Sequence, residues 1–280
     1  MFRLHPETIK RVVSQALAED CGECDLTTEA IVRLNQPASG EFLAKEALVL
    51  AGWEVAAWAF QLRSSECVLE SSYVDGQAVA KGEAIGRVRG PASALLSAER
   101  VALNFLQRLS GIATLTRQYV DAVSGTAAVI VDTRKTTPGL RNLEKYAVRV
   151  GGGRNHRFGL FDGVLIKENH IAVAGGIDQA IASVRRSVDH LKKIEVEVTS
   201  LHELQQALDA GADAVLLDNM KPDEVREAVR LAAGRAVLEV SGGIQLETVR
   251  EYALTGVQII SVGALTHSPR AMDISLELQR

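Results

Sequence analysis

The second half of the chain alternates short apolar stretches with longer amphipathic ones. Val, Ile, Leu and Ala dominate six short stretches that predict buried strands: AVIVDT (128–133), GVLIK (163–167), IEVEV (194–198), AVLLD (214–218), AVLEV (236–240) and IISVG (259–263). Between them, apolar residues recur at helical spacing in 177–193, 200–211, 221–234 and 246–256. Asp, Ser or Pro opens several of these helices and Gly closes them. This alternation predicts a parallel sheet with right-handed crossovers.

Residues able to bind a ligand recur where the predicted strands end. They are Arg134 and Lys135 after the first strand, then Lys167, Glu197, Asp218, Ser241-Gly242-Gly243 and Gly263 at the five that follow. This layout is typical of the active face of a β/α barrel, whereas a doubly wound sheet concentrates function at one switch point. Only six units are clear, and a complete barrel has eight over about 250 residues. We therefore predict an α/β fold with an open or incomplete β/α barrel.

The first part of the chain has a different rhythm. An amphipathic helix is expected over residues 1–20, strands around 40–52 and 66–76, a hairpin over 75–90, and a long helical stretch over 93–123. This pattern predicts a smaller α+β sandwich domain over residues 1–112, ahead of a catalytic barrel over 113–267. The C-terminal segment 268–280, with SLEL at 275–278, is a candidate to join the first domain.

Charge is distributed unevenly along the chain. The whole chain of 280 residues carries a net charge of −4. Residues 134–170 nevertheless contain eight basic residues against three acidic ones. A cationic island in an acidic protein points to a small, densely anionic ligand, because a long polyanion would need basic charge spread over a face. The absence of aromatic residues interleaved with the basic ones also argues against nucleic acid.

Apolar runs and cysteines give the expectations for membrane association, disulfide bonds and location in the cell. No apolar run approaches the roughly 20 residues that cross a bilayer, so we expect no membrane association. The N-terminus is polar and amphipathic, unlike a signal peptide. Three cysteines cannot build a disulfide framework, and a cytoplasmic location is the default expectation.

Several motifs admit both a functional and a plain structural interpretation. The glycines of Ser241-Gly242-Gly243 could bind phosphate through free backbone N–H groups near a helix N-terminus, or could simply form a βα turn. Gly151-Gly152-Gly153 could merely end the helix formed by LEKYAVRV. Glu197 and Asp218 could cap helices, although their place opposite a cationic cluster favours a role with metal or sugar hydroxyls. Arg141, Lys145 and Arg149 fit a solvated helix face.

Two further motifs are better explained structurally. Cys21-x-x-Cys24 could be half a zinc site or a redox pair, but no second pair, suitably spaced His or thioredoxin-like context completes it. The hairpin DGQAVAKGEAIGRVRG resembles those of lipoyl or biotinyl carriers. A carrier needs its modified lysine at an exposed turn, whereas Lys45 falls inside a predicted strand.

One long segment carries a specific family resemblance. DTRKTTPGLRNLEKYAVRVGGGRNHRFGLFDGVLIKENHI, from residue 132, closely resembles the quinolinate phosphoribosyltransferases, also called nicotinate-nucleotide pyrophosphorylases (carboxylating). The likeness covers most of the chain and includes EDCGECDLTT (19–28), AERVALNFLQRLSGIAT (98–114), EVEV (195–198), LLDN (216–219), SGGI (241–244) and SVGALTHS (261–268). Cys24 departs from the glycine more usual in the family, far in sequence from the chemistry.

The resemblance implies an activity in NAD biosynthesis. Ribose phosphate would pass from phosphoribosyl pyrophosphate to the ring nitrogen of quinolinate, with loss of pyrophosphate and carbon dioxide, to give nicotinate mononucleotide. It also implies Mg²⁺ and a homodimer or higher homo-oligomer with shared active sites. No covalent enzyme nucleophile is required.

The same resemblance assigns roles to individual residues. The implied substrate-binding residues are Arg100 (reaching a neighbouring subunit), Arg134, Lys135, His156, Arg157, Lys167, Ser241, Gly242, Gly243 and Gly263. The implied catalytic residues are Lys135, Lys167, Glu197 and Asp218, of which the two acids would lie near Mg²⁺ and the ribose hydroxyls. Two alternatives stay open, namely a molybdenum-utilisation homologue with the same architecture and a non-enzymatic carrier-type module.

Overall fold

The computed structural model describes residues 4–33 and 36–279 and divides into two compact units that interleave in sequence. The first unit contains residues 1–117, 136–152 and 265–280, apart from the undescribed positions, and the second contains 118–135 and 153–264. The predicted boundary at 112/113 placed 136–152 in the barrel domain, whereas this segment groups with the first unit. Among the described residues, none of the helices combines the length and hydrophobicity that a bilayer crossing requires.

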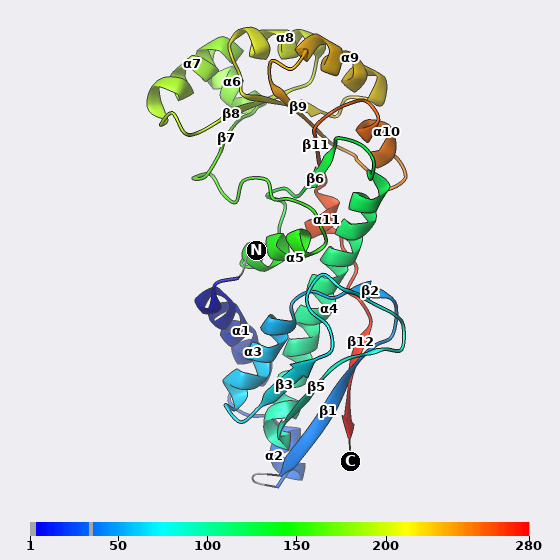
Figure 1. Ribbon diagram of the computed structural model, residues 1–280. Helices are drawn as coiled ribbons and strands as arrows, with labels where there is room; N and C mark the ends of the chain where they lie inside the picture. The colour runs from blue at the N-terminus through cyan, green and yellow to red at the C-terminus, as the bar shows by residue number, and fades with distance from the viewer. Residues whose placement is uncertain (1–3, 34–35, 280) are drawn as a thin grey trace. The chain divides into compact units, whose positions relative to one another are not determined.

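An antiparallel sheet with its covering helices forms the first unit (Figure 1). Its strand order is β12-β1-β5-β3, and a second small sheet pairs β2 with β4. On β1, Phe42 lies opposite Leu276 of β12 and Gly86 of β5. The C-terminal segment therefore does return to the first unit as an edge strand. The strands are β1 (Pro37–Ala44), β2 (Leu48–Val49), β3 (Val68–Ser71), β4 (Ala78–Val79), β5 (Ala84–Pro91) and β12 (Ile274–Gln279).

Aromatic side chains centre the core of this unit. Phe42 is fully buried and makes edge-to-face contacts with Trp53 and Phe60, at ring-centroid distances of 5.2 and 6.0 Å. This geometry suits the ring quadrupoles and adds about 1 kcal/mol per pair to the burial of apolar area. The helices are α1 (Pro6–Cys21), α2 (Leu26–Ile31), α3 (Trp53–Arg63), α4 (Ala92–Ala122), α5 (Arg141–Val150) and α11 (Ala264–His267), of which α4 and α11 extend across a unit boundary.

A buried carboxylate explains why α5 belongs to the first unit. Glu144 has no exposed surface and accepts hydrogen bonds from Arg108 Nε of α4, at 2.9 Å, and from the backbone N–H of Thr137, at 3.0 Å. A buried charge must be paired, and removing one partner typically costs about 3–5 kcal/mol. This interaction joins residues 136–152 to α4, a contact that hydrophobic periodicity does not reveal.

The predicted strand over 40–52 is in fact two strands separated by a bend. β1 ends at Ala44, and Glu46 turns toward the C-terminal segment, where it accepts from the backbone N–H of Asp273 at 2.8 Å. Lys45 therefore lies in an exposed bend and not inside a strand, which corrects the argument used against a carrier lysine. Its ammonium group is paired with Glu277 at 2.5 Å.

Six parallel strands in the order β6-β11-β10-β9-β8-β7 form the second unit. Helices α7, α8 and α9 lie along one side of this curved sheet (Figure 1). Within the described residues no ladder joins β6 to β7, so the prediction of an open β/α barrel is confirmed. The elements are β6 (Val129–Val131), β7 (Val164–Ile166), α6 (Glu168–Ala174), α7 (Ile177–Ser187), β8 (Ile194–Val198), α8 (Leu201–Asp209), β9 (Ala214–Asp218), α9 (Pro222–Ala232), β10 (Val237–Ser241), α10 (Val249–Ala253) and β11 (Ile259–Ser261).

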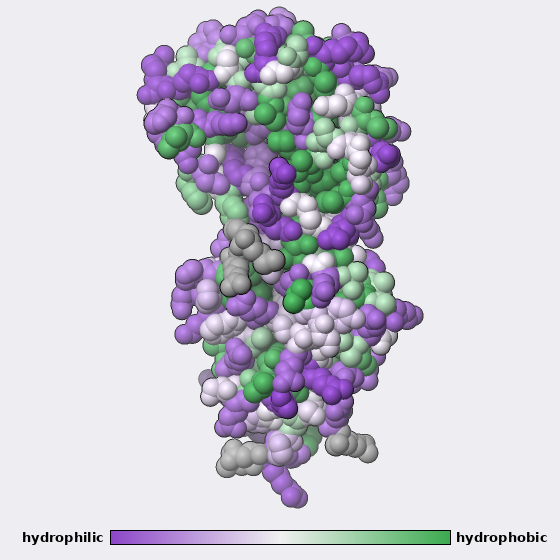
Figure 2. Space-filling model, viewed as in Figure 1, coloured by the Kyte–Doolittle hydropathy of each residue, from purple (hydrophilic) through white to green (hydrophobic). Residues whose placement is uncertain are grey.

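Alternation along β8 separates two chemically different faces. Ile194, Val196 and Val198 are buried, whereas Glu195 and Glu197 between them are half-buried. Because successive strand side chains point to opposite faces, the two carboxylates share the face away from the apolar residues. The helices outside the sheet carry polar residues outward, as the surface over α7 and α9 shows (Figure 2). Glu195 and Glu197 lie on the face opposite these helices, so exposure to solvent on the helix side does not explain their charge.

Candidate active site

The strand ends of the second unit bring the predicted polar residues to one edge of its sheet. Lys167 follows β7, Glu197 lies in β8, Asp218 and Ser241 end β9 and β10, and Gly263 lies just beyond β11. Arg134 and Lys135 follow β6 in the same way. In a parallel sheet all strand carboxyl ends lie at one edge, so residues from six strands gather there.

Lys167 and Glu197 form an ion pair across neighbouring strands. The Lys167 ammonium donates to Glu197 Oε2, and the two side chains are 46% and 19% exposed. The Lys167 backbone N–H donates to Nδ1 of His170 in the first turn of α6, at 3.0 Å. The hydrogen bond to His170 thus fixes the backbone of Lys167 at the start of α6, while the ammonium group stays accessible to a ligand.

A tight turn after β10 requires glycine. Gly242 and Gly243 have φ angles of 95° and 62°. A Cβ atom at Gly242 would lie 2.2 Å from Oδ1 of Asn219, which follows Asp218. Asn219 donates its backbone N–H to the Ser241 carbonyl oxygen at 2.9 Å and its amide to Asp218 Oδ2 at 2.7 Å. Because α10 begins only at Val249, a phosphate here would meet turn N–H groups and not the expected helix N-terminus.

The charges of two guanidinium groups influence each other: Arg134 follows β6, and Arg157 lies in the loop before β7. Burial lowers the pKa of Arg157, and the positive charge of Arg134 lowers it further. Arg157 Nη1 donates to the carbonyl oxygen of Gly163 at 2.9 Å, while its Nε is buried without a hydrogen-bond partner. Like charges held together in a partly buried site favour an anion, because an anion relieves both the desolvation and the repulsion.

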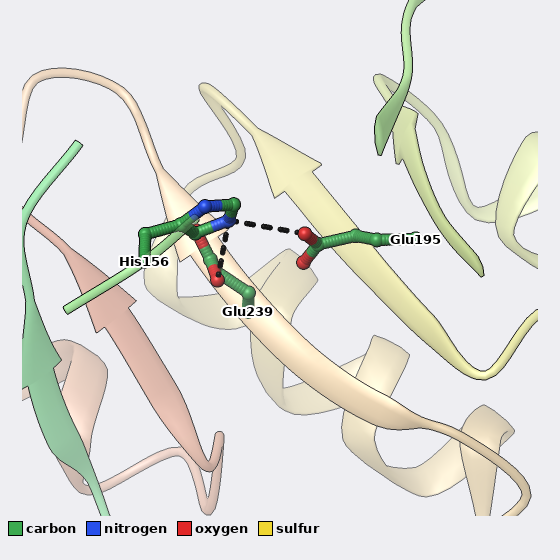
Figure 3. A group of neighbouring side chains, drawn as sticks. All are labelled: His156, Glu195 and Glu239. Atoms are coloured by element: carbon green, nitrogen blue, oxygen red, sulfur yellow. Dashed lines mark hydrogen bonds and ion pairs between the residues drawn. The ribbon is translucent and has the colours of Figure 1, made fainter. Parts of the chain in front are cut away.

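His156 lies between two carboxylates (Figure 3). Its Nε2 is 3.0 Å from Glu195 Oε2 of β8 and 3.6 Å from Glu239 Oε2 of β10. Its Nδ1 accepts the backbone N–H of Arg157 at 2.8 Å. The ring therefore carries its proton on Nε2 when neutral and donates it to Glu195. The family resemblance implied that His156 binds substrate, and the two carboxylates beside its imidazole were not predicted.

Glu239 is the most deeply buried acid of this cluster, with 2% of its surface exposed. Burial raises its pKa to about 7, and the neighbouring Glu195 carboxylate raises it as well. Glu195 and Glu239 are not among the functional residues predicted from the sequence. The available signal was a glutamate flanked by apolar residues inside each of two predicted buried strands, where an ion is costly unless paired.

Replacing Glu239 with glutamine should flatten part of the dependence of stability on pH. A carboxyl group with a raised folded-state pKa binds more protons folded than unfolded, so stability falls as pH rises from about 4.5 to about 7. A shift of this size corresponds to roughly 3 kcal/mol. Urea titrations at about pH 5 and pH 8 should show wild type losing more unfolding free energy than Glu239→Gln. Parallel losses in the two proteins would contradict the raised pKa.

The other residues singled out from the sequence belong to the first unit. Arg100 is an exposed residue of α4 in the first unit. Gly151 follows α5 directly and Gly152 has a φ of 100°, so these glycines end that helix, as the structural interpretation held. The interpretation as a solvated helix face is wrong for Lys145. This residue is fully buried, as are Leu143, Ala147 and Val148 of the same helix. Cys21 and Cys24 are both free thiols.

Comparison with known proteins identifies the family. The model for the quinolinate phosphoribosyl transferase C-terminal domain matches residues 112–277, and that for its N-terminal domain matches residues 25–110. The chain belongs to the quinolinate phosphoribosyltransferase family. It is 45% identical over 270 residues to the probable nicotinate-nucleotide pyrophosphorylase [carboxylating] of Bacillus subtilis (strain 168), covering 96% of this chain and 93% of that protein.

Other members of this family agree over nearly the whole chain. The chloroplastic nicotinate-nucleotide pyrophosphorylase [carboxylating] of Arabidopsis thaliana is 44% identical to this chain. The alignment covers 98% of this chain and 84% of the plant protein. The solved nicotinate-nucleotide pyrophosphorylase of Francisella tularensis matches with a TM-score of 0.95 and 41% identity, covering 99% of this chain and 98% of that one. The resemblance that the sequence suggested is thus confirmed.

Proposed function

We propose that this chain transfers the ribose-phosphate group of phosphoribosyl pyrophosphate to the ring nitrogen of quinolinate. The products are nicotinate mononucleotide, pyrophosphate and carbon dioxide. The proposal rests chiefly on the gathering of basic side chains, acidic side chains and a glycine turn at one edge of the second unit's sheet. Family membership supports the same reaction, because the relatives named above carry this activity in their names.

The basic groups suit a pyridine diacid. Quinolinate carries two adjacent carboxylates. The strand ends supply Arg134, Lys135 and Lys167, and the loop before β7 supplies Arg157. A guanidinium group can bind a carboxylate through two parallel hydrogen bonds, which fixes the plane of the ring as well as its charge. Holding the ring in this way directs its nitrogen toward the anomeric carbon of the sugar.

The acidic groups and the turn suit the sugar polyphosphate. Ser241, Gly242 and Gly243 would offer backbone N–H groups to phosphate, together with Gly263 just beyond β11. Glu197 and Asp218 fit Mg²⁺, which prefers one or two protein carboxylates completed by substrate phosphates and water. When bound there, Mg²⁺ would neutralise charge on the departing pyrophosphate.

The reaction proceeds without a covalent enzyme intermediate. The ring nitrogen donates its electron pair to the anomeric carbon as the carbon–oxygen bond to pyrophosphate breaks. Lys167 and Lys135 stabilise negative charge that develops on the leaving group, and the nearby carboxylates favour the positive charge that develops on the sugar. The ribosylated ring is cationic, so it accepts the electron pair that remains at ring carbon 2 when carbon dioxide leaves. That carbon then takes up one proton.

The assembly and location form part of the same proposal. Arg100 is exposed on the first unit, and we infer that it completes the active site of a neighbouring subunit in a homodimer or larger homo-oligomer. We infer a cytoplasmic location and no nucleic-acid partner, in keeping with small charged substrates.

A product assay tests the proposal directly. Purified protein with quinolinate, phosphoribosyl pyrophosphate and Mg²⁺ should yield nicotinate mononucleotide, pyrophosphate and carbon dioxide in equal amounts, measured by mass spectrometry and release of labelled carbon dioxide. Omitting Mg²⁺ in the presence of a chelator should stop the reaction. Formation of a nucleotide that keeps both carboxylates, or no nucleotide at all, would refute the assignment.

A further inference from the structure

We propose that Glu195 is a positioning residue. By accepting a hydrogen bond from His156 inside the sheet, with the Glu239 carboxyl group buried 3.6 Å from the same nitrogen, it holds the Asn155-His156-Arg157 segment in place for quinolinate. The inference deepens the proposed function and rests on it. Neither acid belongs to the set that the resemblance assigned to substrate or metal.

The two acids occupy an unusual place for charged side chains. Glu239 is 2% exposed and Glu195 has a side-chain exposure of 13%. Both lie in strands whose neighbouring residues are buried and apolar. Replacing a buried ionic cluster with apolar residues is often neutral or stabilising, so a cluster of this kind adds little stability. Its value lies in the orientation it imposes on His156.

The backbone of the same segment is anchored independently at β6. Asp132 is fully buried and accepts from the His156 backbone N–H at 3.0 Å and from the Asn155 side-chain amide at 2.5 Å. Arg154 joins the edge of β6 through hydrogen bonds to Ile130 and Asp132. The segment is thus held at its backbone by the end of β6, and at the imidazole by Glu195 of β8.

The imidazole passes this constraint directly to Arg157. With Nε2 bound to Glu195, the ring plane is set, and Nδ1 then accepts the Arg157 backbone N–H at 2.8 Å. Arg157 also donates to Gly163. A guanidinium group binds a carboxylate through two bonds only when its position and plane are right, and small displacements at such a site are costly. Removal of the Glu195 carboxylate should therefore weaken the binding of quinolinate more than the binding of phosphoribosyl pyrophosphate.

A metal ion is the competing interpretation of the same three residues. One ligand atom from each of His156, Glu195 and Glu239 lies within 4.8 Å of the others. The geometry favours a hydrogen-bonded cluster, because Nε2 lies at hydrogen-bond distance from Glu195 Oε2 and Nδ1 already accepts a backbone N–H. Metal analysis of purified protein separates the two interpretations.

Steady-state kinetics on Glu195 variants test the inference. Glu195→Ala should raise KM for quinolinate about tenfold or more, the loss expected for a misplaced charged hydrogen bond, with KM for phosphoribosyl pyrophosphate changed less than about twofold. Glu195→Gln keeps an acceptor for Nε2 and should restore most of the affinity for quinolinate. Val196→Ala, on the opposite face of β8, is the matched control, since it should lower thermal stability and leave both KM values unchanged. Should Glu195→Ala not fold, Glu195→Asp keeps the charge, withdraws the carboxylate and should also raise KM for quinolinate.

Three results would overturn the inference. They are an unchanged KM for quinolinate in a folded Glu195→Ala or Glu195→Asp protein, a parallel rise of both KM values, and stoichiometric metal that survives dialysis and is lost in Glu195→Ala. A wild-type protein that makes no product would instead refute the proposed function, so the two failures are distinguishable.

Discussion

Nicotinate is expected to be a far poorer acceptor than quinolinate, with kcat/KM lower by at least about 100-fold. Nicotinate lacks the 2-carboxylate, so part of the basic set around Arg134, Arg157 and Lys167 would be left without an anion. A charged group in a partly buried site loses roughly 1.5–3 kcal/mol for each charge-assisted hydrogen bond that is not replaced. Burial and the charge of Arg134 already lower the pKa of Arg157, so leaving its guanidinium group without a bound carboxylate should be costly.

Initial rates with each acid at saturating phosphoribosyl pyrophosphate would measure this selectivity. Benzene-1,2-dicarboxylate is a useful control, because it has both carboxylates and no ring nitrogen and should therefore bind competitively without turnover. Similar kcat/KM values for quinolinate and nicotinate would show that the basic set does not recognise a diacid.

Mixed subunits should recover activity that each parent variant lacks. Arg100→Ala and Lys167→Ala are each expected to lower kcat/KM by about 100-fold or more, because each removes a cation from the same proposed site. If Arg100 acts in a neighbouring subunit, a hybrid dimer has one intact site. Random mixing makes half of the dimers hybrids, so about a quarter of wild-type activity should return.

Co-expression with two different affinity tags allows hybrids to be purified and their activity measured. A matched control mixes Lys167→Ala with Asp218→Ala, which damage the same barrel and should leave hybrids with no intact barrel site. Purified Arg100/Lys167 hybrids that remain inactive would contradict sharing across the interface.

Hydrophobic periodicity predicted the second unit well, because its strands and helices have different periods and regular caps. All six predicted strands occur as β6 to β11, and their carboxyl-end residues lie where a parallel sheet must place them. The first unit was harder to predict. Its strand pairing is non-local, so β1 with β12 could be proposed only as a return of the chain end.

Buried polar contacts account for most of what the sequence did not reveal. Glu144 assigns α5 to the first unit through Arg108, and Lys145 is buried although helical spacing suggested a solvated face. Glu195 and Glu239 become interpretable only when His156 is seen between them. Glu144 pairs with Arg108, and Glu195 with His156, over more than 30 residues of sequence, and hydrophobic periodicity does not report such pairings.

A crystal structure of the protein with quinolinate would show whether the basic side chains of the second unit bind a pyridine diacid. We expect both carboxylates within hydrogen-bond distance of basic side chains drawn from Arg134, Lys135, Arg157 and Lys167, with the ring nitrogen facing the glycine turn after β10. Quinolinate bound elsewhere, or with its carboxylates turned toward solvent, would refute this mode of recognition.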